Sequence, residues 1–255
     1  MKLASWNVNS LRVRWPHLQA WLAEHSPDVM CLQETKIVDA DFPLTDCRGL
    51  DYRVVFHGQK SYNGVAMLSR TEPANVVRGI PGFGDEQCRV LAASYGELRV
   101  VNVYVPNGQS VGSEKYAYKL AWLAALRDYL ENARQEYAQV VVAGDFNIAP
   151  EPMDVHDPAA WEGSVMVSDA ERAAFAALLD LGFVDVFRAR APLETAFTWW
   201  DYRQGAFRRN LGLRIDHILA SQALAARCSE CLIDKGPRRL SRPSDHAPLW
   251  AEFTF

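Results

Sequence analysis

Short polar clusters recur along this sequence where apolar runs end, and their residue types suit phosphate chemistry. A buried strand that stops at Asp, Glu, Asn or His delivers that side chain to the rim of a sheet. Hard oxygen ligands together with an imidazole are typical of a divalent-metal site that acts on phosphate esters. The clusters are Ser5-Trp6-Asn7-Val8-Asn9, Gln33-Glu34-Thr35-Lys36, Gly144-Asp145-Phe146-Asn147, Arg214-Ile215-Asp216-His217 and Ser244-Asp245-His246.

Glu34 and Asp145 are the carboxylates of the second and third clusters. Glu34 follows an apolar run, and a single carboxylate with an open side suits Mg²⁺, which keeps several waters; a solvated strand end has the same pattern. Asp145 and Asn147 are two residues apart and are expected to face one cavity, with Phe146 anchored inward. The amide could then donate to a phosphate oxygen while the carboxylate orients a water. Gly144 permits a close backbone approach.

The last cluster places an acid beside an imidazole. Asp245 and His246 precede Pro248, which favours a turn here over a regular strand. A catalytic His needs an orienting acid to hold one tautomer or its charge, and Asp216 is the candidate partner. A structural histidine would look the same in sequence.

Three further polar side chains sit at the ends of expected strands. Tyr104 closes an apolar run, where its phenol could donate to a phosphate or simply be an interfacial aromatic. Asn7 and Asn9 are amides that serve either as ligands or as turn formers.

Helices alternate with hairpins and isolated strands in the expected secondary structure. This mixture predicts an α/β or α+β sandwich and argues against a purely parallel sheet. Gly96-Glu97 signals a hairpin, 35–50 reads as irregular, and nothing divides 1–255 into more than one domain. Helices are expected at 12–25, over about 20 residues after the cap Ser113, and from the Ser168 to Glu171 capping box to near Gly182. Strands are expected at 2–6, 28–33, 52–56, 64–69, 89–94, 98–105, 139–144, 214–220, 229–234 and 249–255.

Composition limits the class of protein. Hydrophobic residues make up 49% of the 255 and charged residues 23%, enough for a substantial core. The net charge of -4 gives no support to a nucleic-acid partner, although 21 of the 27 cations are Arg, the better phosphate clamp. A GC-rich genome would also enrich Arg. We expect a cytoplasmic protein with reduced thiols. The sequence has five Cys with a lone C-x-x-C, no apolar run of membrane length and no signal-like start.

Taken together and in order, the clusters resemble the exonuclease III family of apurinic/apyrimidinic endonucleases, within the endonuclease/exonuclease/phosphatase group. The W-W-D-Y-R and G-L-R-I-D stretches are similar to the DNA-repair branch of that group. The matching segments are 5–12, 28–36, 56–66, 104–108, 144–150, 197–203, 210–221 and 243–248.

The resemblance implies a fold and a role for each polar residue. The fold would be a DNase I-like four-layered sandwich of two packed mixed β-sheets flanked by helices, with the site at one edge. The ion would be Mg²⁺ or Mn²⁺. The implied roles are metal binding for Glu34 with Asn7, water activation for Asp145, phosphate contact for Asn147, Tyr104 and His246, orientation of His246 by Asp216, and support of the metal or of the leaving oxygen by Asp245. Whether Asp145 or His246 is the general base stays open, as does the number of metal ions.

The implied substrate is duplex DNA with abasic sites or 3′ ends, attacked by a monomer through abasic-site incision, 3′-5′ exonuclease or 3′-phosphatase activity. Asn107 lies in the Y-V-P-N-G segment and would contact substrate. Trp199 and Leu213 would wall the sugar pocket; Leu213 replaces a larger aromatic of some relatives, and the bulky Met166 lies nearby. The expected phosphate-binding rim is Arg12, Arg14, Lys60, Arg203, Arg208, Arg209, Arg238, Arg239 and Arg242.

Two alternatives are weighed against this reading. A catalytically silent paralogue that binds nucleic acid would be expected to have lost Glu34, Asp145 or His246, and all three are present. A phosphatase of the same group remains the second alternative, whereas a secreted nuclease would be expected to carry a signal peptide and disulfides.

Overall fold

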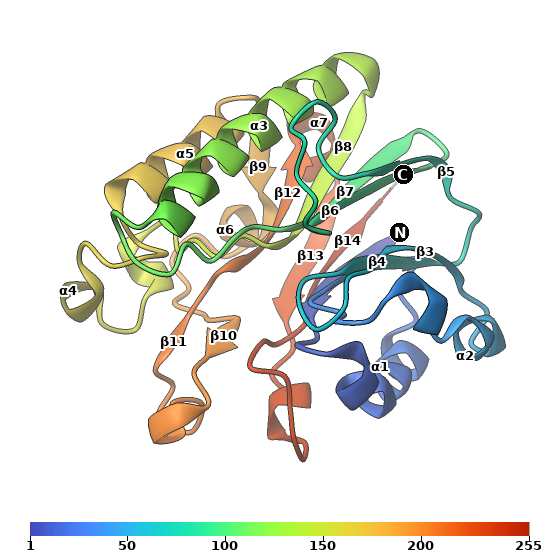
Figure 1. Cartoon of the computed structure of the whole chain (residues 1–255), viewed down its shortest axis with the longest axis horizontal. Coiled ribbons are helices and arrows are strands. Elements are labelled where there is room, and N and C mark those ends of the chain that lie inside the picture. The colour runs from blue at the N-terminus through green and yellow to red at the C-terminus, as the bar shows by residue number, and fades with distance from the viewer. Residues whose placement is uncertain (255) are drawn as a thin grey trace.

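Two mixed β-sheets packed face to face form the centre of the computed structural model, which describes residues 1–254 (Figure 1). The first sheet has the order β13-β14-β1-β2-β4-β3 and the second β5-β6-β7-β8-β12-β9. Only β1–β2 and β7–β8 pair in parallel; the other pairings in these two sheets are antiparallel. The strands are β1 Lys2–Asn7, β2 Val29–Gln33, β3 Arg53–His57, β4 Val65–Ser69, β5 Ala74–Arg78, β6 Val90–Tyr95, β7 Leu98–Tyr104, β8 Gln139–Asp145, β9 Phe183–Asp185, β12 Asp216–Ser221, β13 Cys228–Ile233 and β14 Leu249–Phe253, with a separate pair β10 Trp199–Trp200 and β11 Gly212–Leu213.

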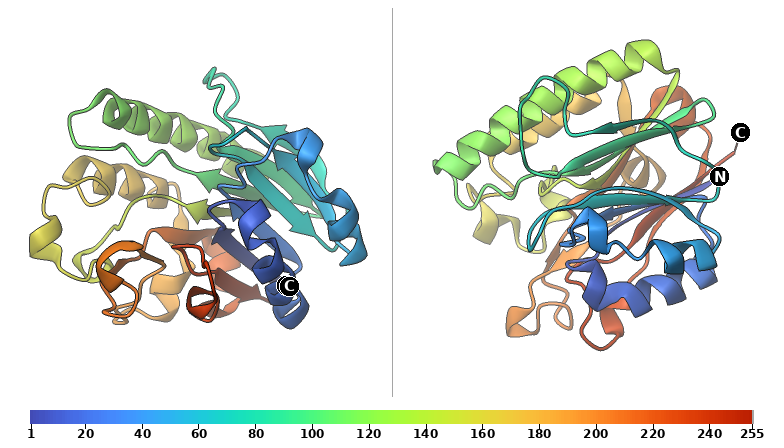
Figure 2. Two further views of the ribbon diagram at one scale, coloured as in Figure 1. Left: turned by 60° about the horizontal axis from the view of Figure 1, so that its bottom comes forward. Right: turned by 45° about the vertical axis from the view of Figure 1, so that its right-hand side comes forward.

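Helices cover the outer face of each sheet, with α3 and α5 above the second sheet and α1 and α2 below the first (Figures 1 and 2). The four layers therefore follow the expected sandwich. The helices are α1 Leu11–His25, α2 Leu44–Gly49, α3 Glu114–Glu136, α4 Pro158–Trp161, α5 Asp169–Leu179, α6 Val186–Arg190 and α7 Gln222–Ala225, with the 3₁₀ turns η1 Asp39–Asp41, η2 Pro152–Asp154, η3 Arg203–Gly205 and η4 Pro237–Arg239.

Alternation along the strands explains why their sequences are apolar on both faces. In β8, Val141 and Ala143 point into the core between the sheets, whereas Val140 and Val142 point into the core beneath α3 and α5. Strands that are covered on both sides have no polar face to display. The unbroken apolar runs are thus the signature of the central layers.

The ends of the central strands meet at one edge of the sandwich. Parallel β1 and β2 both end there, as do parallel β7 and β8. Antiparallel β12 begins there, with Asp216 in register with Asp145. One edge thus collects polar residues that are far apart in the chain.

The secondary structure departs from expectation in a few places. The segment 35–50, expected to be irregular, contains η1 and α2, whose Cys47 is fully buried against the first sheet. The strand expected from 214 starts only at Asp216, because the backbone N–H groups of Ile215 and Asp216 both donate to Thr198 Oγ1 at 3.0 Å. The strand expected over 249–255 ends at Phe253, and residue 255 lies outside the described residues. The hairpin at Gly96-Glu97 and the Ser168 capping box are confirmed.

The structure shows the state of the cysteines and the character of the helices. All five thiols are free and buried. Among residues 1–254, no helix combines the length and the apolar character needed to cross a bilayer.

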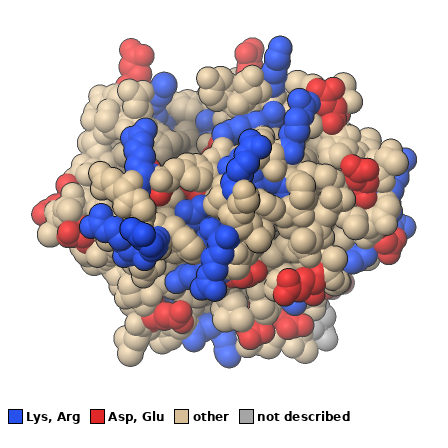
Figure 3. Space-filling view, turned by 90° about the horizontal axis from the view of Figure 1, so that it is seen from below, with Lys and Arg blue, Asp and Glu red and all other residues tan. Residues whose placement is uncertain are grey.

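One face of the molecule carries a concentration of Lys and Arg (Figure 3). The segments 201–211 and 234–244 project on this side in Figure 1. Their exposed cations are Arg203, Arg208, Arg209, Arg239 and Arg242.

Candidate active site

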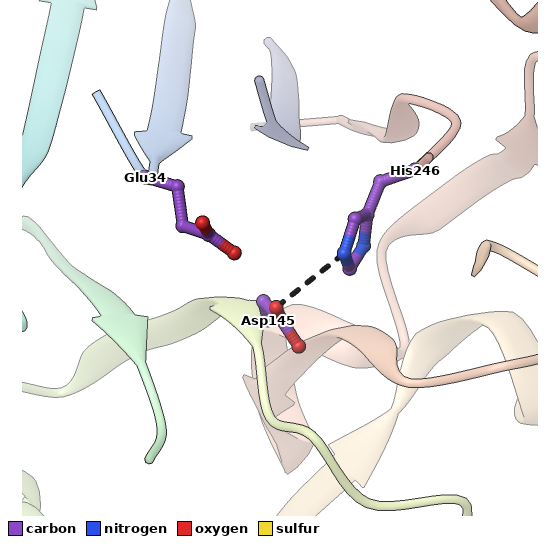
Figure 4. Close-up of side chains that lie close together, drawn as sticks. All are labelled: Glu34, Asp145 and His246. Carbon is purple, nitrogen blue, oxygen red and sulfur yellow. Dashed lines mark ion pairs between the residues drawn. The ribbon is translucent and has the colours of Figure 1, made fainter. Parts of the chain in front are cut away.

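Glu34, Asp145 and His246 converge at the sheet edge, one from the end of β2, one from the end of β8 and one from the segment before β14 (Figure 4). Their potential ligand atoms all lie within 4.8 Å of one another. Asp145 and His246 are buried, and Glu34 is partly exposed. The arrangement is a cluster of two acids and an imidazole that can hold a metal ion.

Glu34 is fixed by the turn that follows β2. Glu34 and Lys36 both have left-handed backbones, with φ of 51° and 53°. Asn7 Nδ2 donates to Glu34 Oε1 at 2.8 Å, and Lys36 Nζ lies 2.8 Å from Oε2. Gly64 packs so tightly beneath this turn that a Cβ there would lie 2.2 Å from Thr35 Oγ1. Both carboxylate oxygens are therefore held near the cluster.

Asp145 lies at the centre of the cluster. Its Oδ2 accepts from Asn7 Nδ2 at 2.9 Å and lies 3.7 Å from His246 Nε2, while Oδ1 accepts from the backbone N–H of Asn147 at 2.9 Å. Burial, reinforced by Asp216 and Glu34, raises the pKa of Asp145 to about 7 against the opposing effects of His246 and Asn7. A carboxyl group with a proton affinity near neutrality suits acid–base work.

His246 is held by the partner that the sequence suggested. Its Nδ1 lies 2.8 Å from Asp216 Oδ2. Burial disfavours the imidazolium, but Asp216, Asp145 and Asp245 outweigh burial and raise the pKa of His246 to about 10. The ring therefore presents a positive charge through Nε2, on the side of Asp145.

The amides and the phenol lie around the same edge. Phe146 is anchored in the core as expected. Asn147 is itself buried, and its Nδ2 donates to the Val105 carbonyl at 3.0 Å. Asn107 Nδ2 donates to Asn147 Oδ1 at 3.1 Å. Burial, with Glu34 and Asp145 adding to it, raises the pKa of Tyr104 well above the usual phenol range, so its hydroxyl keeps its proton.

Asp245 is placed by two donors. Asn9 Nδ2 donates to its Oδ1 at 2.9 Å and Trp199 Nε1 to its Oδ2 at 3.0 Å. The cluster of Glu34, Asp145 and His246 does not include it, so direct metal binding by Asp245 stays a prediction. Asn7 likewise presents its NH₂ to the two carboxylates, which makes it their orienting donor.

Trp199 and Leu213 form an apolar wall beside Asp245. They are register partners in the β10–β11 pair and pack in one cluster with Val155 and Met166. Leu213 has no exposed surface, so it supports this wall from behind, whereas Trp199 is partly exposed. Their contact with substrate stays a prediction.

The arginines of the expected basic rim fall into two groups, exposed ones and ones that are bonded internally. Arg203, Arg208 and Arg209 are exposed on 201–211. Arg238 is not a surface cation: its side chain is buried over the Phe207 ring and donates to the Ser244 carbonyl. Arg14 is also committed internally, to Asn9 O at 2.6 Å and Pro243 O at 2.8 Å. Both arginines brace the loops that carry the site, because loop carbonyls outside a sheet need donors.

A groove of about 520 Å³ opens beside Asn107. Arg89 lines it, stacks 4.6 Å over the Tyr104 ring and donates to the Tyr104 carbonyl at 3.2 Å. Sequence reasoning did not single out Arg89, Lys36 or the buried Lys119. The signal for Lys119 was available, since it occupies a core position in the apolar stripe of α3.

Comparison with known proteins agrees with this fold. A model of the endonuclease/exonuclease/phosphatase family matches residues 4–246. Exodeoxyribonuclease III of Haemophilus influenzae is 40% identical over 266 residues, covering 99% of this chain and 100% of that protein. Among solved structures, the 3′ phosphatase NExo from Neisseria bound to product DNA hairpin has a TM-score of 0.99 at 44% identity. An AP endonuclease from Archaeoglobus fulgidus has a TM-score of 0.97 at 43% identity, and both alignments cover 100% of both chains.

The fold and the clustered acids define a hydrolase-type site on a DNase I-like sandwich. The chain belongs to the endonuclease/exonuclease/phosphatase family, and its relatives are of the exodeoxyribonuclease III and AP endonuclease type.

Proposed function

We propose that this protein is a metal-dependent DNA repair phosphodiesterase that attacks duplex DNA at abasic sites and at 3′ ends. The observation that carries the proposal is the convergence of Glu34, Asp145 and His246 at one edge, with Asp216 behind the imidazole. The relatives support it by name: one is an exodeoxyribonuclease, one a 3′ phosphatase on DNA and one an AP endonuclease.

The donor set fits a hard divalent cation. Carboxylate oxygens of Glu34 and Asp145 are the ligands that Mg²⁺ and Mn²⁺ prefer, and the partly exposed Glu34 leaves room for water and a phosphate oxygen. Asn7 would orient both carboxylates, and Asp245 would support the ion or the leaving oxygen. When bound, the ion would neutralise negative charge that develops on the phosphoryl oxygens.

The protein groups divide the remaining work. Asp145 would position the attacking water and accept its proton. His246, charged through Asp216, would donate from Nε2 to a phosphoryl oxygen, with Asn147 and Tyr104 as further donors. Asn107 would hold the adjacent phosphate. Fixed donors around one oxygen stabilise the transition state more than the ground state.

Substrate choice would depend on the surroundings of the site. Trp199, with Leu213 behind it, would face the sugar, and an apolar wall excludes a nucleotide that still carries its base. The exposed Arg203, Arg208 and Arg209 would contact backbone phosphates. The protein would work as a monomer in the cytoplasm, a setting in which five free buried thiols would stay reduced.

A gel assay on one labelled duplex tests this proposal. Three substrates are compared: an internal abasic site, a 3′-phosphate and a recessed 3′-hydroxyl, each with Mg²⁺, Mn²⁺ or a chelator. We expect metal-dependent cleavage of at least one substrate and none with chelator. Absence of cleavage on all three with either metal, from protein shown to be folded, would contradict the proposal.

A further inference from the structure

Lys119 is a lysine with no exposed surface, on the buried face of α3. Its neighbours on that stripe are Tyr116, Leu123 and Leu126, so an apolar residue would be the ordinary choice there. A buried ammonium is costly unless every one of its N–H groups is paired. A special reason is needed for a charge at this position.

The three donors of the ammonium are all satisfied, and two of them reach the active-site loops. Lys119 Nζ donates to the carbonyl of Asn107 at 3.1 Å, to the carbonyl of Asn147 at 2.7 Å and to Glu171 Oε1 at 2.5 Å. An ammonium has three N–H groups, so none is left for any other role.

The two carbonyls belong to Asn107 and Asn147, the residues proposed above as phosphate donors. Asn107 and Asn147 lie just beyond β7 and β8, where the sheet ladder has ended, and their side chains bond to each other at 3.1 Å. Asn147 has a left-handed backbone, φ 50°, and its N–H also holds Asp145 Oδ1. The ammonium thus ties together the two loops at the point from which the phosphate donors project.

Glu171 extends this tie to a third loop. The same carboxylate accepts from the backbone N–H of Met166 at 2.9 Å and from Ser168 Oγ at 2.6 Å. Met166 packs in the apolar cluster that contains Leu213 and borders Trp199. The ion pair therefore lies between the phosphate donors and the wall beside Asp245.

We propose that Lys119 is a positioning residue: with Glu171 as its counter-ion, it sets the placement of Asn107 and Asn147 for the reaction. This inference rests on the proposed function. Replacing a buried ion pair by apolar residues is often neutral for stability, which favours a role in geometry over a role in folding.

A double-mutant cycle between Lys119→Met and Asn147→Ala tests the assignment. Met removes the ammonium and keeps an unbranched apolar side chain that is one atom shorter than that of Lys. We expect Lys119→Met to lower kcat about 10-fold or more with KM changed less than about 3-fold, because the donors would be misplaced rather than removed. In the Asn147→Ala background the same change should lower kcat less, by less than about 3-fold, since one of the two amides that Lys119 positions is already gone.

Leu126→Met, about two turns further along the same buried stripe, is the matched control for a disturbed core and should leave kcat unchanged. If Lys119→Met fails to fold, the pair Lys119→Met/Glu171→Gln removes both charges and is compared in the same two backgrounds. Equal reductions of kcat in both backgrounds, or no reduction in either, would overturn the assignment. An inactive wild-type protein would instead defeat the proposed function itself.

Discussion

At the scale of single residues, Asp145 and His246 set each other's charge. The His246 imidazolium opposes the effect of burial on Asp145, and the carboxylates around His246 overcome the burial of the ring. Asp216 contributes most to this because it lies 2.8 Å from Nδ1, on the side away from the cluster. The imidazole is thus held in one orientation, with Nε2 free to face a substrate oxygen.

Replacing Asp145 by Asn tests the role of its charge. The amide is nearly isosteric, and its one carbonyl oxygen can still accept from either Asn7 Nδ2 or the Asn147 N–H, so we expect the fold to be retained. The kcat for the best of the three DNA substrates should fall at least ~10²-fold, the scale of a removed acid–base group. The check is steady-state kinetics with saturating Mg²⁺, alongside a thermal melt. A near-wild-type rate would rule out Asp145 as the group that activates water.

At the scale of elements, the parallel pair β7–β8 delivers Tyr104 and Asp145 side by side, and this closeness depends on Gly144. Val103 and Gly144 are register partners, and Gly144 has φ of 153°. A Cβ at that position would lie 1.9 Å from the Val103 carbonyl oxygen. No side chain other than hydrogen fits between these strands.

Gly144→Ala should therefore disturb the site more than its size suggests. The Cβ would force β7 and β8 apart next to Asp145, which we expect to cost about 2 kcal/mol of stability, in the range of overpacked cores. The kcat should fall at least ~10-fold, because an ångström-scale displacement of a catalytic group has large effects. Urea unfolding and kinetics on the same preparation provide the check. Gly96→Ala at the β6–β7 turn, where φ is 61° and nothing lies within 4 Å, is the control for backbone strain without a clash. Unchanged activity in Gly144→Ala would show that β7 and β8 can accommodate the added Cβ without displacing Asp145.

A second element-scale feature is a buried ion network that joins η2, β9 and the segment before β12. Arg214 Nη1 lies 2.6 Å from Asp185 Oδ2, and its Nε lies 2.6 Å from Asp154 Oδ1. Burial opposes the ionisation of Asp185, but Arg214 and His217 more than offset burial and hold the pKa of Asp185 well below its usual range.

The lowered pKa of Asp185 makes stability depend on pH. Its contribution is fully present above the pKa of an unfolded Asp, near ~4, and is lost progressively as the pH falls from there toward the folded-state pKa. We expect the free energy of unfolding to fall between about pH 5 and pH 3 by more in the wild type than in Asp185→Asn. Urea titrations at the two pH values measure this. Equal acid sensitivity of the two proteins would mean that other carboxylates dominate.

At the scale of the whole molecule, an acidic total charge coexists with a basic face. The net charge is -4, yet Lys and Arg gather on the side where 201–211 and 234–244 project (Figure 3). Contact with a polyanion depends on the charges within a Debye length of about 10 Å and not on the net charge of the whole protein. DNA binding by this face is therefore compatible with the overall composition.

The pair variant Arg208→Ala/Arg209→Ala tests that face. We expect weaker binding to duplexes of any sequence, because phosphate contacts carry no base information. The slope of log K against log salt should become shallower by about 1 for each phosphate that the variant no longer neutralises. Arg127→Ala on α3, the helix at the top of Figure 1, is the control. If affinity and salt slope both match the wild type, those residues lie outside the footprint.

Features of the fold and the site that depend on a local sequence pattern could be predicted, whereas features that depend on long-range contacts could not. Apolar runs and caps placed the long elements correctly, because strands covered on both faces and capped helices have local signatures. The polar strand ends identified Glu34, Asp145 and His246, which the structure brings together.

The misses have a common physical cause. α2 was overlooked because it is short and its only buried residue, Cys47, gives no periodic pattern. Arg238 and Arg14 were expected at the surface. The sequence does not reveal that the Arg238 guanidinium packs over Phe207 or that Arg14 donates to a loop carbonyl. The position of Lys119 in the apolar stripe of α3 was visible in the sequence, but its role was not, because its three acceptors lie in other segments of the chain.

The order in which the chain is made gives one of these features a biological consequence. His246 lies 212 positions after Glu34, and β14, which follows His246, inserts between β13 and β1 in the middle of a sheet. A growing polypeptide on the ribosome therefore lacks both the imidazole and a completed first layer until His246 and β14 have emerged. If the protein cuts DNA as proposed, nascent chains and fragments that end before His246 are harmless to the genome, and the ability to cut arrives only once His246 and β14 have been made.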